Sequence, residues 1–369
     1  MKKQRIVLAS VLKPVDDVRM FEKIGKSLSA ITGHDVFIIG YPSKAPVADL
    51  KITFIPLPAF DRLSLKRMWM PMLILKKIYK LKPEIVIVNT HELLIVAMLI
   101  RIFFGCRIVY DVQENYWRNI LYTDAFLAPI RPLIAAWVRA KETVLSPFID
   151  LFLLAEKGFE KEMKFFGKRY VILENKSLLP PAFVRLISER TIQLLFSGTI
   201  SESTGIFQAI GLASSLHQLD PSVRLNIIGY CSRPSTLLKV KQSVAGKPYI
   251  TITGGDQLVP HSQIISSIAT ADFGILYYPA SQHTENKVPT KLYEYLSARL
   301  PILIQNHRPW TELCLPCHAA ISIDFTLPFD APALLKQMEQ ADFYTSAPKD
   351  VDWLSEEKKL LASIKNISY

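Results

Sequence analysis

The sequence has few cysteines and no hydrophobic run long enough to cross a membrane. Four cysteines in 369 residues do not make the disulfide framework of a secreted domain and are typical of a reducing compartment. The most apolar stretch, residues 93–104, includes Arg101 and is well short of the roughly 20 residues that a membrane-spanning helix needs. The basic start is followed by only a short apolar segment without a small-residue cleavage site, so no signal peptide is predicted and we expect a cytoplasmic protein.

Common nucleotide and hydrolase motifs are also missing. No G-x-G-x-x-G follows Ile6 or Phe196, and neither a G-x-x-x-x-G-K-[ST] phosphate loop nor a G-x-S-x-G nucleophile elbow occurs, which disfavours hydride transfer, ATP hydrolysis and ester hydrolysis. Cys314-Leu-Pro-Cys317-His318 matches a redox or haem pattern. Haem attachment, however, needs an exported protein, zinc needs further ligands, and a redox pair should follow the first strand of its fold. We therefore predict no cofactor and no metal site.

What the sequence does contain indicates two globular domains. Its length suffices for two cores. Half of the residues are hydrophobic and 21% are charged, which is ordinary for a folded protein. The net charge of +11 favours acidic partners such as nucleotide phosphates, anionic lipids or nucleic acid, without choosing among them.

Runs of β-branched residues and leucine alternate with amphipathic segments along the first half of the chain. This alternation predicts parallel strands joined by helices that cover both faces of a sheet. The expected strands are residues 5–9, 35–40, 51–56, 85–88, 107–110, 151–154 and 170–173, and the expected helices are residues 18–28, 64–81, 93–104, 129–145 and 156–166.

The alternation restarts after a turn-rich segment near residue 180. Here the expected strands are residues 192–196, 223–228, 250–253, 273–276 and 301–304, and the expected helices are residues 205–218, 261–269, 290–299 and 351–364. The sequence thus predicts an α/β protein with two doubly wound parallel-sheet domains, residues 1–180 and 181–350, followed by a terminal helix within residues 351–369 that returns to the first domain.

Polar residues and glycines follow several of the predicted strands. Doubly wound domains bind ligands at the carboxyl ends of their strands, so two facing domains line a cleft with these loops. The loops carry Asp17, Arg19, Asn89, His91, Asp111 and Glu114 in the first domain, and Gly198, Gly205, Gly229 and the approach to Lys291 in the second.

One of these loops, rich in proline, leads into a helix that begins near Thr290. The first N–H groups of a helix are unpaired and its positive end attracts anions. Lys291 near this start therefore suits a phosphate, and Glu294, one turn later, can accept hydrogen bonds from a sugar hydroxyl. A capped surface helix with a solvated lysine and glutamate is the structural alternative.

Five stretches together resemble the retaining glycosyltransferases of family 4 over nearly the whole chain. They are Gly33-His-Asp-Val36, His91-Glu-Leu-Leu94, Tyr110-Asp-Val-Gln-Glu114, Gly198 to Gly205, and Pro289-x-Lys291-x-x-Glu294-Tyr295. The resemblance implies the GT-B fold, with two domains facing across a cleft. It also implies transfer of a sugar from a nucleotide-diphosphate donor in the second domain to an acceptor held by the first. No metal is implied, because positive charge and helix-end N–H groups can stabilise the leaving diphosphate.

The resemblance also assigns roles within the site. Glu294 matches the glutamate that holds the nucleotide ribose, while Lys291, Gly198 and Gly205 would lie near the phosphates, where glycine lets the backbone approach an anion. The candidate donor-binding residues are Gly198, Thr199, Thr204, Gly205, Gly229, Lys287, Lys291 and Glu294, and the candidate catalytic residues are Gln113, Asn286 and Glu294.

Four positions depart from the family's pattern. Thr199 and Thr204 stand where the family usually has arginine and lysine, and each lost charged contact to a buried phosphate costs roughly 1.5 to 3 kcal/mol. Asn286 stands for a glutamate of the donor loop. Gln113 stands for the active-site histidine and cannot carry a proton near neutral pH.

Lys287, Lys291 and Arg19 are the candidates to replace the missing cations. The structural alternatives are that Arg19 pairs with Asp16 or Asp17 and that Lys287 is solvated. The acceptor-side candidates are Asp17, Arg19, His91 and Glu114, with His91 either contacting an acceptor or capping the next helix.

Residues 66–80 bear on possible partners. They mix basic residues with Trp69, Met70, Met72 and Leu73, a pattern typical of an interfacial membrane helix and also of an amphipathic helix packed on the first sheet. Contact with the inner face of a membrane favours a lipid-linked acceptor. Nucleic acid is not expected, because no strand combines aromatic and basic residues for base stacking.

Two functions follow from these residues. One is an active, metal-independent, retaining glycosyltransferase of polysaccharide or glycolipid assembly, which Lys291 and Glu294 favour. The other is a catalytically degenerate GT-B protein that binds a nucleotide sugar or a partner without transfer, which Thr199, Thr204 and Gln113 favour.

Overall fold

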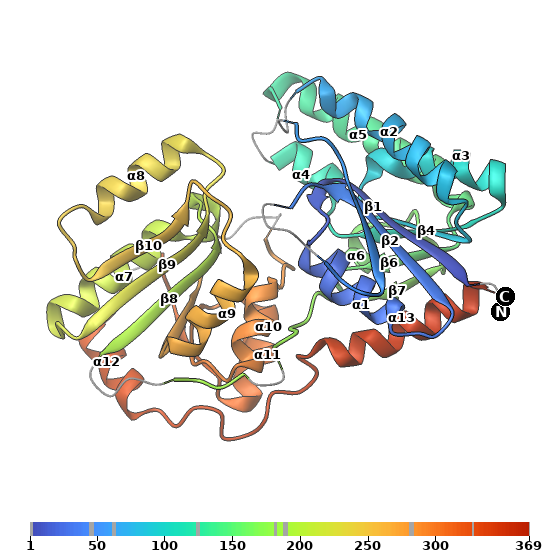
Figure 1. The fold of residues 1–369 in the computed structure, drawn as a ribbon. Helices are drawn as coiled ribbons and strands as arrows, with labels where there is room; N and C mark the ends of the chain where they lie inside the picture. The colour runs from blue at the N-terminus through green and yellow to red at the C-terminus, as the bar shows by residue number, and fades with distance from the viewer. Residues whose placement is uncertain are drawn as a thin grey trace. The chain divides into compact units, whose positions relative to one another are not determined.

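The structure is a computed structural model that describes residues 3–43, 48–60, 64–122, 126–180, 183–186, 191–279, 284–326 and 328–368. It divides into two compact units (Figure 1): unit 1 contains Met1–Asn175 and Trp353–Tyr369, and unit 2 contains Lys176–Asp352. Each unit has its own sheet and its own hydrophobic core.

Seven parallel strands form the sheet of unit 1. They are β1 (Gln4–Pro14), β2 (His34–Tyr41), β3 (Ile52–Pro56), β4 (Ile85–Val88), β5 (Arg107–Val112), β6 (Leu151–Leu154) and β7 (Tyr170–Ile172). Their order is β3-β2-β1-β4-β5-β6-β7, and Val7 of β1 lies opposite Phe37 of β2 and Val86 of β4. β4 and β6 are buried along their whole length. This burial confirms the parallel sheet that continuous apolar runs predict.

Helices cover both faces of this sheet (Figure 1). They are η1 (Val18–Gly25), α1 (Lys26–Ser29), α2 (Lys66–Leu81), η2 (His91–Leu93), α3 (Leu94–Phe104), α4 (Tyr116–Tyr122), η3 (Ala128–Ile130), α5 (Arg131–Leu145), η4 (Ser146–Phe148), α6 (Phe159–Glu162) and α13 (Trp353–Ser368). The terminal helix α13 packs beside α1, where Trp353 Nε1 donates to Ser27 Oγ at 3.0 Å.

Two predicted helices of unit 1 differ in the structure. Residues 18–28 form the π-helix η1 followed by α1, and not one α-helix; the carboxylate of Asp17 accepts the first free N–H groups of η1. Residues 156–166 are helical only over α6, because Met163 takes an extended backbone and Phe166 turns into the core beside Phe152.

Unit 2 repeats the architecture with six parallel strands. The strands are β8 (Ile192–Thr199), β9 (Val223–Tyr230), β10 (Ile250–Gly255), β11 (Phe273–Leu276), β12 (Ile302–Gln305) and β13 (Ala320–Ile323), and the helices are η5 (Glu202–Thr204), α7 (Ile206–Leu219), α8 (Pro234–Val244), α9 (His261–Thr270), α10 (Thr290–Ser297), α11 (Arg308–Cys314), η6 (Leu315–Cys317) and α12 (Ala331–Gln340). The strand order is β10-β9-β8-β11-β12-β13. One face of the sheet is covered by α7, α8 and α12, and the other by α9, α10 and α11.

In unit 2, α8, α11, α12 and β13 were not predicted, and neither was the short helix α4 of unit 1. Three of these helices, α8, α11 and α12, share one feature. Each of the three helices has a proline in its first turn, where proline is favoured because the first N–H groups have no partner in the helix. That proline was the available signal. β13 is a short strand at the edge of the sheet, and its partly exposed residues do not form a continuous apolar run.

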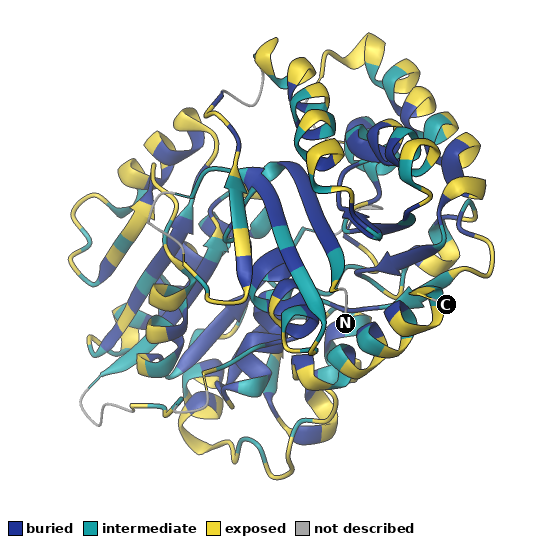
Figure 2. Ribbon diagram, turned by 45° about the vertical axis from the view of Figure 1, so that its right-hand side comes forward, coloured by how far each residue is buried: buried dark blue, intermediate teal, exposed yellow. Residues whose placement is uncertain are grey.

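Burial follows the layers of each unit (Figure 2). The strands are mostly buried, and the helices turn one stripe to the sheet and another to solvent, as amphipathic helices on a sheet do. Among the helices of the described residues, none combines the length and the apolar character that crossing a membrane requires.

Candidate functional site

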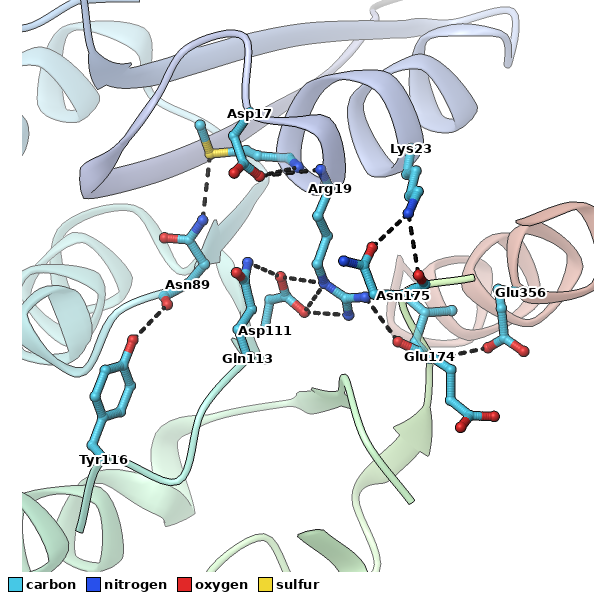
Figure 3. A network of polar contacts seen from close by, with 12 residues as sticks. Asp17, Arg19, Lys23, Asn89, Asp111, Gln113, Tyr116, Glu174, Asn175 and Glu356 are labelled. Atoms are coloured by element: carbon cyan, nitrogen blue, oxygen red, sulfur yellow. Dashed lines mark hydrogen bonds and ion pairs between the residues drawn. The ribbon is translucent and has the colours of Figure 1, made fainter. Parts of the chain in front are cut away.

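A buried ion pair joins η1, the helix that follows β1, to the end of β5 in unit 1 (Figure 3). The guanidinium of Arg19 donates from Nε to both carboxylate oxygens of Asp111 at 3.0 Å and from Nη2 to Oδ1 at 2.6 Å. Its Nη1 donates to the carbonyl of Leu173 at 2.9 Å. Both charged side chains are buried. A bidentate pair with this burial ties η1 to β5 and to the residue that follows β7.

Gln113 belongs to the same network. Its Nε2 donates to Asp111 Oδ2 at 2.7 Å, so Asp111 orients both Arg19 and the amide of Gln113. No described residue donates a hydrogen bond to the Gln113 amide oxygen, which is left as an acceptor. The alternative that Arg19 pairs with Asp16 or Asp17 is wrong, because the guanidinium pairs with Asp111. The carboxylate of Asp17 instead accepts from the backbone N–H of Arg19 at 3.1 Å.

His91 contacts Lys141, a residue that was not predicted to belong to the site. Lys141 Nζ lies 2.8 Å from His91 Nδ1, and the ring meets Tyr116 edge-on with centroids 4.7 Å apart. Burial, with Lys141 and Arg67 nearby, lowers the pKa of His91 to about 3. The ring is therefore neutral, and because an ammonium is only a donor, Nδ1 accepts and Nε2 carries the proton.

The remaining acceptor-side predictions have separate partners. The N-cap of η2 is Thr90, and the His91 side chain contacts Lys141, so the capping role held open for His91 is not what the structure shows. Glu114 is exposed, and its Oε2 accepts from Asn119 Nδ2 at 2.6 Å. Arg19 and Gln113 thus come together on the carboxylate of Asp111, Asp17 binds the backbone of Arg19, and His91 and Glu114 have other partners.

Glu142 is a second buried acid at this edge that sequence reasoning missed. It is 1% exposed, its Oε1 accepts from the Tyr110 hydroxyl at 3.0 Å, and its Oε2 has no hydrogen-bond partner among the described residues. Burial raises the pKa of Glu142 to about 7. The available signal was an acid on the buried stripe of α5, which contains Ala135, Val138, Glu142 and Leu145.

In unit 2, glycines allow close packing at the ends of β8 and β9 and beside Tyr277, which follows β11. Gly198 of β8 lies opposite Gly229 of β9, and a Cβ on Gly229 would lie 1.6 Å from the Gly198 carbonyl oxygen. Gly205 has a φ of 76°, and a Cβ there would lie 2.2 Å from the ring of Tyr277. Only glycine fits these positions, so the backbone of the loop after β8 is tightly placed.

Thr199 and Thr204 are bonded to each other within this loop. Thr204 Oγ1 donates to the carbonyl of Thr199 at 2.7 Å, and with Ser201 it forms a capping box at the start of η5. The hydroxyl of Thr204 is therefore occupied within the loop, while the side chain of Thr199 is exposed.

Lys291 is buried at the start of α10. It is 8% exposed, its Nζ donates to the Ser197 carbonyl at 3.1 Å, and its ammonium lies 4.6 Å from the ring centroid of Phe196 and 5.6 Å from that of Tyr278. Burial lowers its pKa to about 8, against the opposing effect of Glu294. An anion that binds beside the Lys291 ammonium would stabilise its charged form.

Glu294 is buried as well, at 6% exposed, and its Oε1 lies 2.8 Å from His261 Nε2. No side chain of the described residues caps the start of α10, and most of the helix is buried. The alternative of a capped surface helix with a solvated lysine and glutamate is therefore wrong.

The loop before α10 is anchored at its backbone. The carbonyl of Lys287 accepts from Trp310 Nε1 at 2.7 Å, and the N–H of Lys287 donates to the Thr284 carbonyl at 3.0 Å. The side chain of Asn286 is exposed and that of Lys287 is half-buried.

Cysteines and acids form no other centre in the part of the chain that the structure describes. There, no group of three or more histidine, cysteine or acidic side chains is placed to hold a metal ion. Cys314 and Cys317 are buried thiols, and burial raises the pKa of Cys314 to about 12, which disfavours the reactive thiolate.

Solved structures with the same fold match the chain over almost its whole length. A sucrose-phosphate synthase from Thermosynechococcus elongatus has a TM-score of 0.71 at 12% identity, with 99% of each chain covered. WaaG, a glycosyltransferase involved in lipopolysaccharide biosynthesis, has a TM-score of 0.66 at 14% identity, with 98% of each chain covered. HepE from Anabaena in complex with UDP-glucose has a TM-score of 0.65 at 11% identity, covering 98% of this chain and 99% of that one.

No protein-family model matches the sequence, and a search of curated proteins gives no match. The structural likeness confirms the predicted GT-B fold with its two doubly wound parallel-sheet domains. At this level of identity it shows the fold, and the function has to be argued from the site.

Proposed function

We propose that this protein is a glycosyltransferase that moves a sugar from a nucleotide-diphosphate donor to a polysaccharide or glycolipid acceptor, retaining the anomeric configuration and using no metal ion. The observation that carries the proposal is the start of α10, where buried Lys291 and buried Glu294 lie one turn apart beside the glycine-lined end of β8. The GT-B fold supports it, and among its solved neighbours HepE binds UDP-glucose.

In the proposed donor complex the diphosphate lies at the start of α10. Lys291 has three N–H donors, one of which is used by the Ser197 carbonyl, so the others can bind phosphate oxygens. Gly198 and Gly205 let the backbone of the neighbouring loop approach the anion. Lys287 adds a second positive charge from the preceding loop.

The remaining donor-site candidates contribute in other ways. Glu294 accepts a ribose hydroxyl. Gly229 keeps the ends of β8 and β9 close, Thr204 shapes the loop after β8 through its bond to the Thr199 carbonyl, and Asn286 offers an amide to the sugar.

The chemical step needs no side-chain base. The bond between the anomeric carbon and the diphosphate oxygen breaks with its electron pair going to the diphosphate. The acceptor oxygen bonds to the same face of that carbon, and its proton passes to the departing diphosphate oxygen. Gln113 and Asn286 cannot take this proton, because amides do not titrate near neutral pH; they bind and orient the sugar. Lys291 and the helix start stabilise the developing charge.

Unit 1 supplies the acceptor side in this proposal. Gln113 offers its amide oxygen, held in place by Asp111, and neutral His91 offers Nε2–H. Arg19 is a positioning residue and not a phosphate ligand, because each nitrogen of its guanidinium already donates to Asp111 or to the Leu173 carbonyl. Asp17 holds the loop that carries Arg19, and exposed Glu114 can accept from an acceptor hydroxyl.

We also propose peripheral contact with an anionic membrane surface through unit 1. α2 buries Met70, Ile74 and Ile78 against the sheet, as the packed-helix alternative requires, and its exposed residues include both large hydrophobic side chains and lysines. Residues 65–82 hold six basic residues and no acidic one, a charge that suits anionic lipids. The exposed large hydrophobic side chains here are Leu65, Met68, Trp69, Met72 and Tyr79, and on α5 they are Leu133, Trp137 and Val144. Such contact would place a lipid-linked acceptor within reach.

Calorimetric titration with a panel of nucleotide-diphosphate sugars tests the proposal. We expect one donor to bind the parent and to lose binding in Glu294→Ala, with binding kept in Glu339→Ala, a matched exposed acid on α12. Silence from every donor would contradict a donor site. Transfer or hydrolysis of the sugar that binds then separates an active enzyme from a protein that binds without transfer.

A further inference from the structure

A histidine from a different helix holds the carboxylate of Glu294. His261 is the first residue of α9, and its Nε2 lies 2.8 Å from Glu294 Oε1. The side chain of His261 is 19% exposed and that of Glu294 is 8% exposed. An ionised carboxylate can only accept, so Nε2 carries the proton.

We propose that His261 is a positioning residue of the nucleotide site, which keeps Glu294 oriented with one carboxylate oxygen occupied and the other directed to a single ribose hydroxyl. The inference rests on the proposed function, since it concerns how Glu294 meets the ribose. It adds a residue that sets the preference for ribose over deoxyribose.

The two oxygens of Glu294 differ in the structure. Oε1 accepts from His261. Oε2 accepts no hydrogen bond from a described residue, and the Glu294 side chain keeps 8% of its surface exposed. Oε1 is therefore engaged by His261, and Oε2 is the oxygen with no protein donor among the described residues.

Both partners stand on elements fixed to the same sheet of unit 2. α9 is anchored by buried Ile265 and Ile268, and α10 by a row of buried side chains that includes Leu292 and Leu296. Such anchoring lets one hydrogen bond hold the carboxylate in a single orientation. A carboxylate without that bond could rotate and accept from either ribose hydroxyl or from water, which would cost discrimination between sugars.

The test uses the full chain and compares ribose with deoxyribose. UDP, GDP and ADP are titrated into the parent by calorimetry, and the tightest binder is compared with its 2′-deoxy and 3′-deoxy analogues. Loss of one hydrogen bond between a hydroxyl and a carboxylate weakens binding by about 10-fold or more. We expect that penalty for one deoxy analogue and less than about 3-fold for the other, because Glu294 has one oxygen with no protein donor among the described residues.

Variants at His261 then separate positioning from a merely structural role. In His261→Ala the penalty for the sensitive analogue should fall to within about 3-fold, and His261→Gln, which keeps a side-chain N–H donor, should restore most of it. Glu294→Gln should also reduce the penalty, and combining it with His261→Ala should reduce it no further. His318→Asn is the matched control, because this histidine is exposed and asparagine tolerates its left-handed backbone.

The possible failures are distinguishable. If none of the three nucleotides binds the parent, the proposed function fails and the role of His261 fails with it. If a nucleotide binds but the penalty is unchanged in His261→Ala, or the parent penalises both analogues equally, the role of His261 is overturned while the nucleotide site stands. Equal weakening for ribose and deoxyribose forms would also overturn it, because that is what loss of local structure produces; thermal unfolding midpoints of all variants identify such a loss.

Discussion

The carboxyl edges of the two sheets use buried charge in different ways. In unit 1, Arg19, Asp111 and Gln113 satisfy one another, and the guanidinium donates from every nitrogen to groups of the protein. In unit 2, Lys291 and Glu294 are buried too, but Lys291 donates to the Ser197 carbonyl alone and Glu294 accepts from His261 alone among the described residues. In unit 1 the charged groups neutralise each other, whereas in unit 2 Lys291 keeps N–H donors and Glu294 keeps an acceptor that a ligand could use.

Removing a buried charge should therefore affect mainly folding in unit 1 and mainly ligand binding in unit 2. A closed ion pair that loses one member leaves a buried charge without compensation. A charge held by a single carbonyl already bears most of its desolvation cost in the unliganded protein, so its removal should weaken binding more than folding.

The largest expected effect comes from breaking the buried ion pair between Arg19 and Asp111 in unit 1. Arg19→Met leaves Asp111 buried without its cation, and we expect the free energy of unfolding to fall by about 3 to 5 kcal/mol, measured by urea denaturation followed by circular dichroism. Arg308→Met is the control: its pair with Glu312 is exposed, so its effect should stay below about 1 kcal/mol. Equal losses in the two variants would refute the distinction between closed and exposed pairs.

The second effect concerns the other buried acid of unit 1. The pKa of Glu142 rises from 4.5 to about 7 on folding, so the folded chain binds this proton more tightly than the unfolded chain. Its contribution to stability is therefore present below pH 4.5 and declines as pH rises to about 7. The decline amounts to about 3 kcal/mol. Glu142→Gln should remove this slope from the pH dependence of unfolding, and an unchanged slope would argue against the raised pKa.

The third prediction concerns the buried ammonium of Lys291 in unit 2. Lys291→Met should weaken binding of the nucleotide diphosphate by about 10- to 100-fold without lowering the thermal unfolding midpoint. Because the pKa of Lys291 is about 8, binding to the parent should weaken as pH rises above 8, and the variant should lack this dependence. Lys241→Met, an exposed lysine on α8, is the control and should leave affinity unchanged. A clear loss of stability in Lys291→Met would place its role in folding.

The smallest effect concerns the outer surfaces of the two units. Trp137→Ser, on the exposed face of α5, should reduce binding to vesicles with anionic lipid by a few-fold, roughly 1 kcal/mol, and added salt should reduce it further. Leu258→Ser removes an exposed hydrophobic residue of unit 2 and should have no effect. Cosedimentation measures both, and equal responses would contradict membrane contact through unit 1.

Much of the fold could be predicted because its signals are local. The predicted strands 85–88, 151–154 and 273–276 match β4, β6 and β11 at both ends, since a continuous apolar run between polar residues has only one place in a buried parallel sheet. The helix predicted over 156–166 failed because aromatic packing in the core overrode the helical pattern of that segment.

For the site, the sequence alone predicted that Arg19, Asp111 and the approach to Lys291 lie at or after the carboxyl ends of strands, because parallel strands bring these ends to one side. It did not identify Lys141, Glu142 or His261. Only the tertiary structure decided the pairs. Arg19 bonds to Asp111 across 92 positions, His91 to Lys141 across 50, and Glu294 to His261 across 33. Periodicity and turn chemistry act over a few residues, whereas these contacts depend on helix packing and burial, which exist only once each unit has folded.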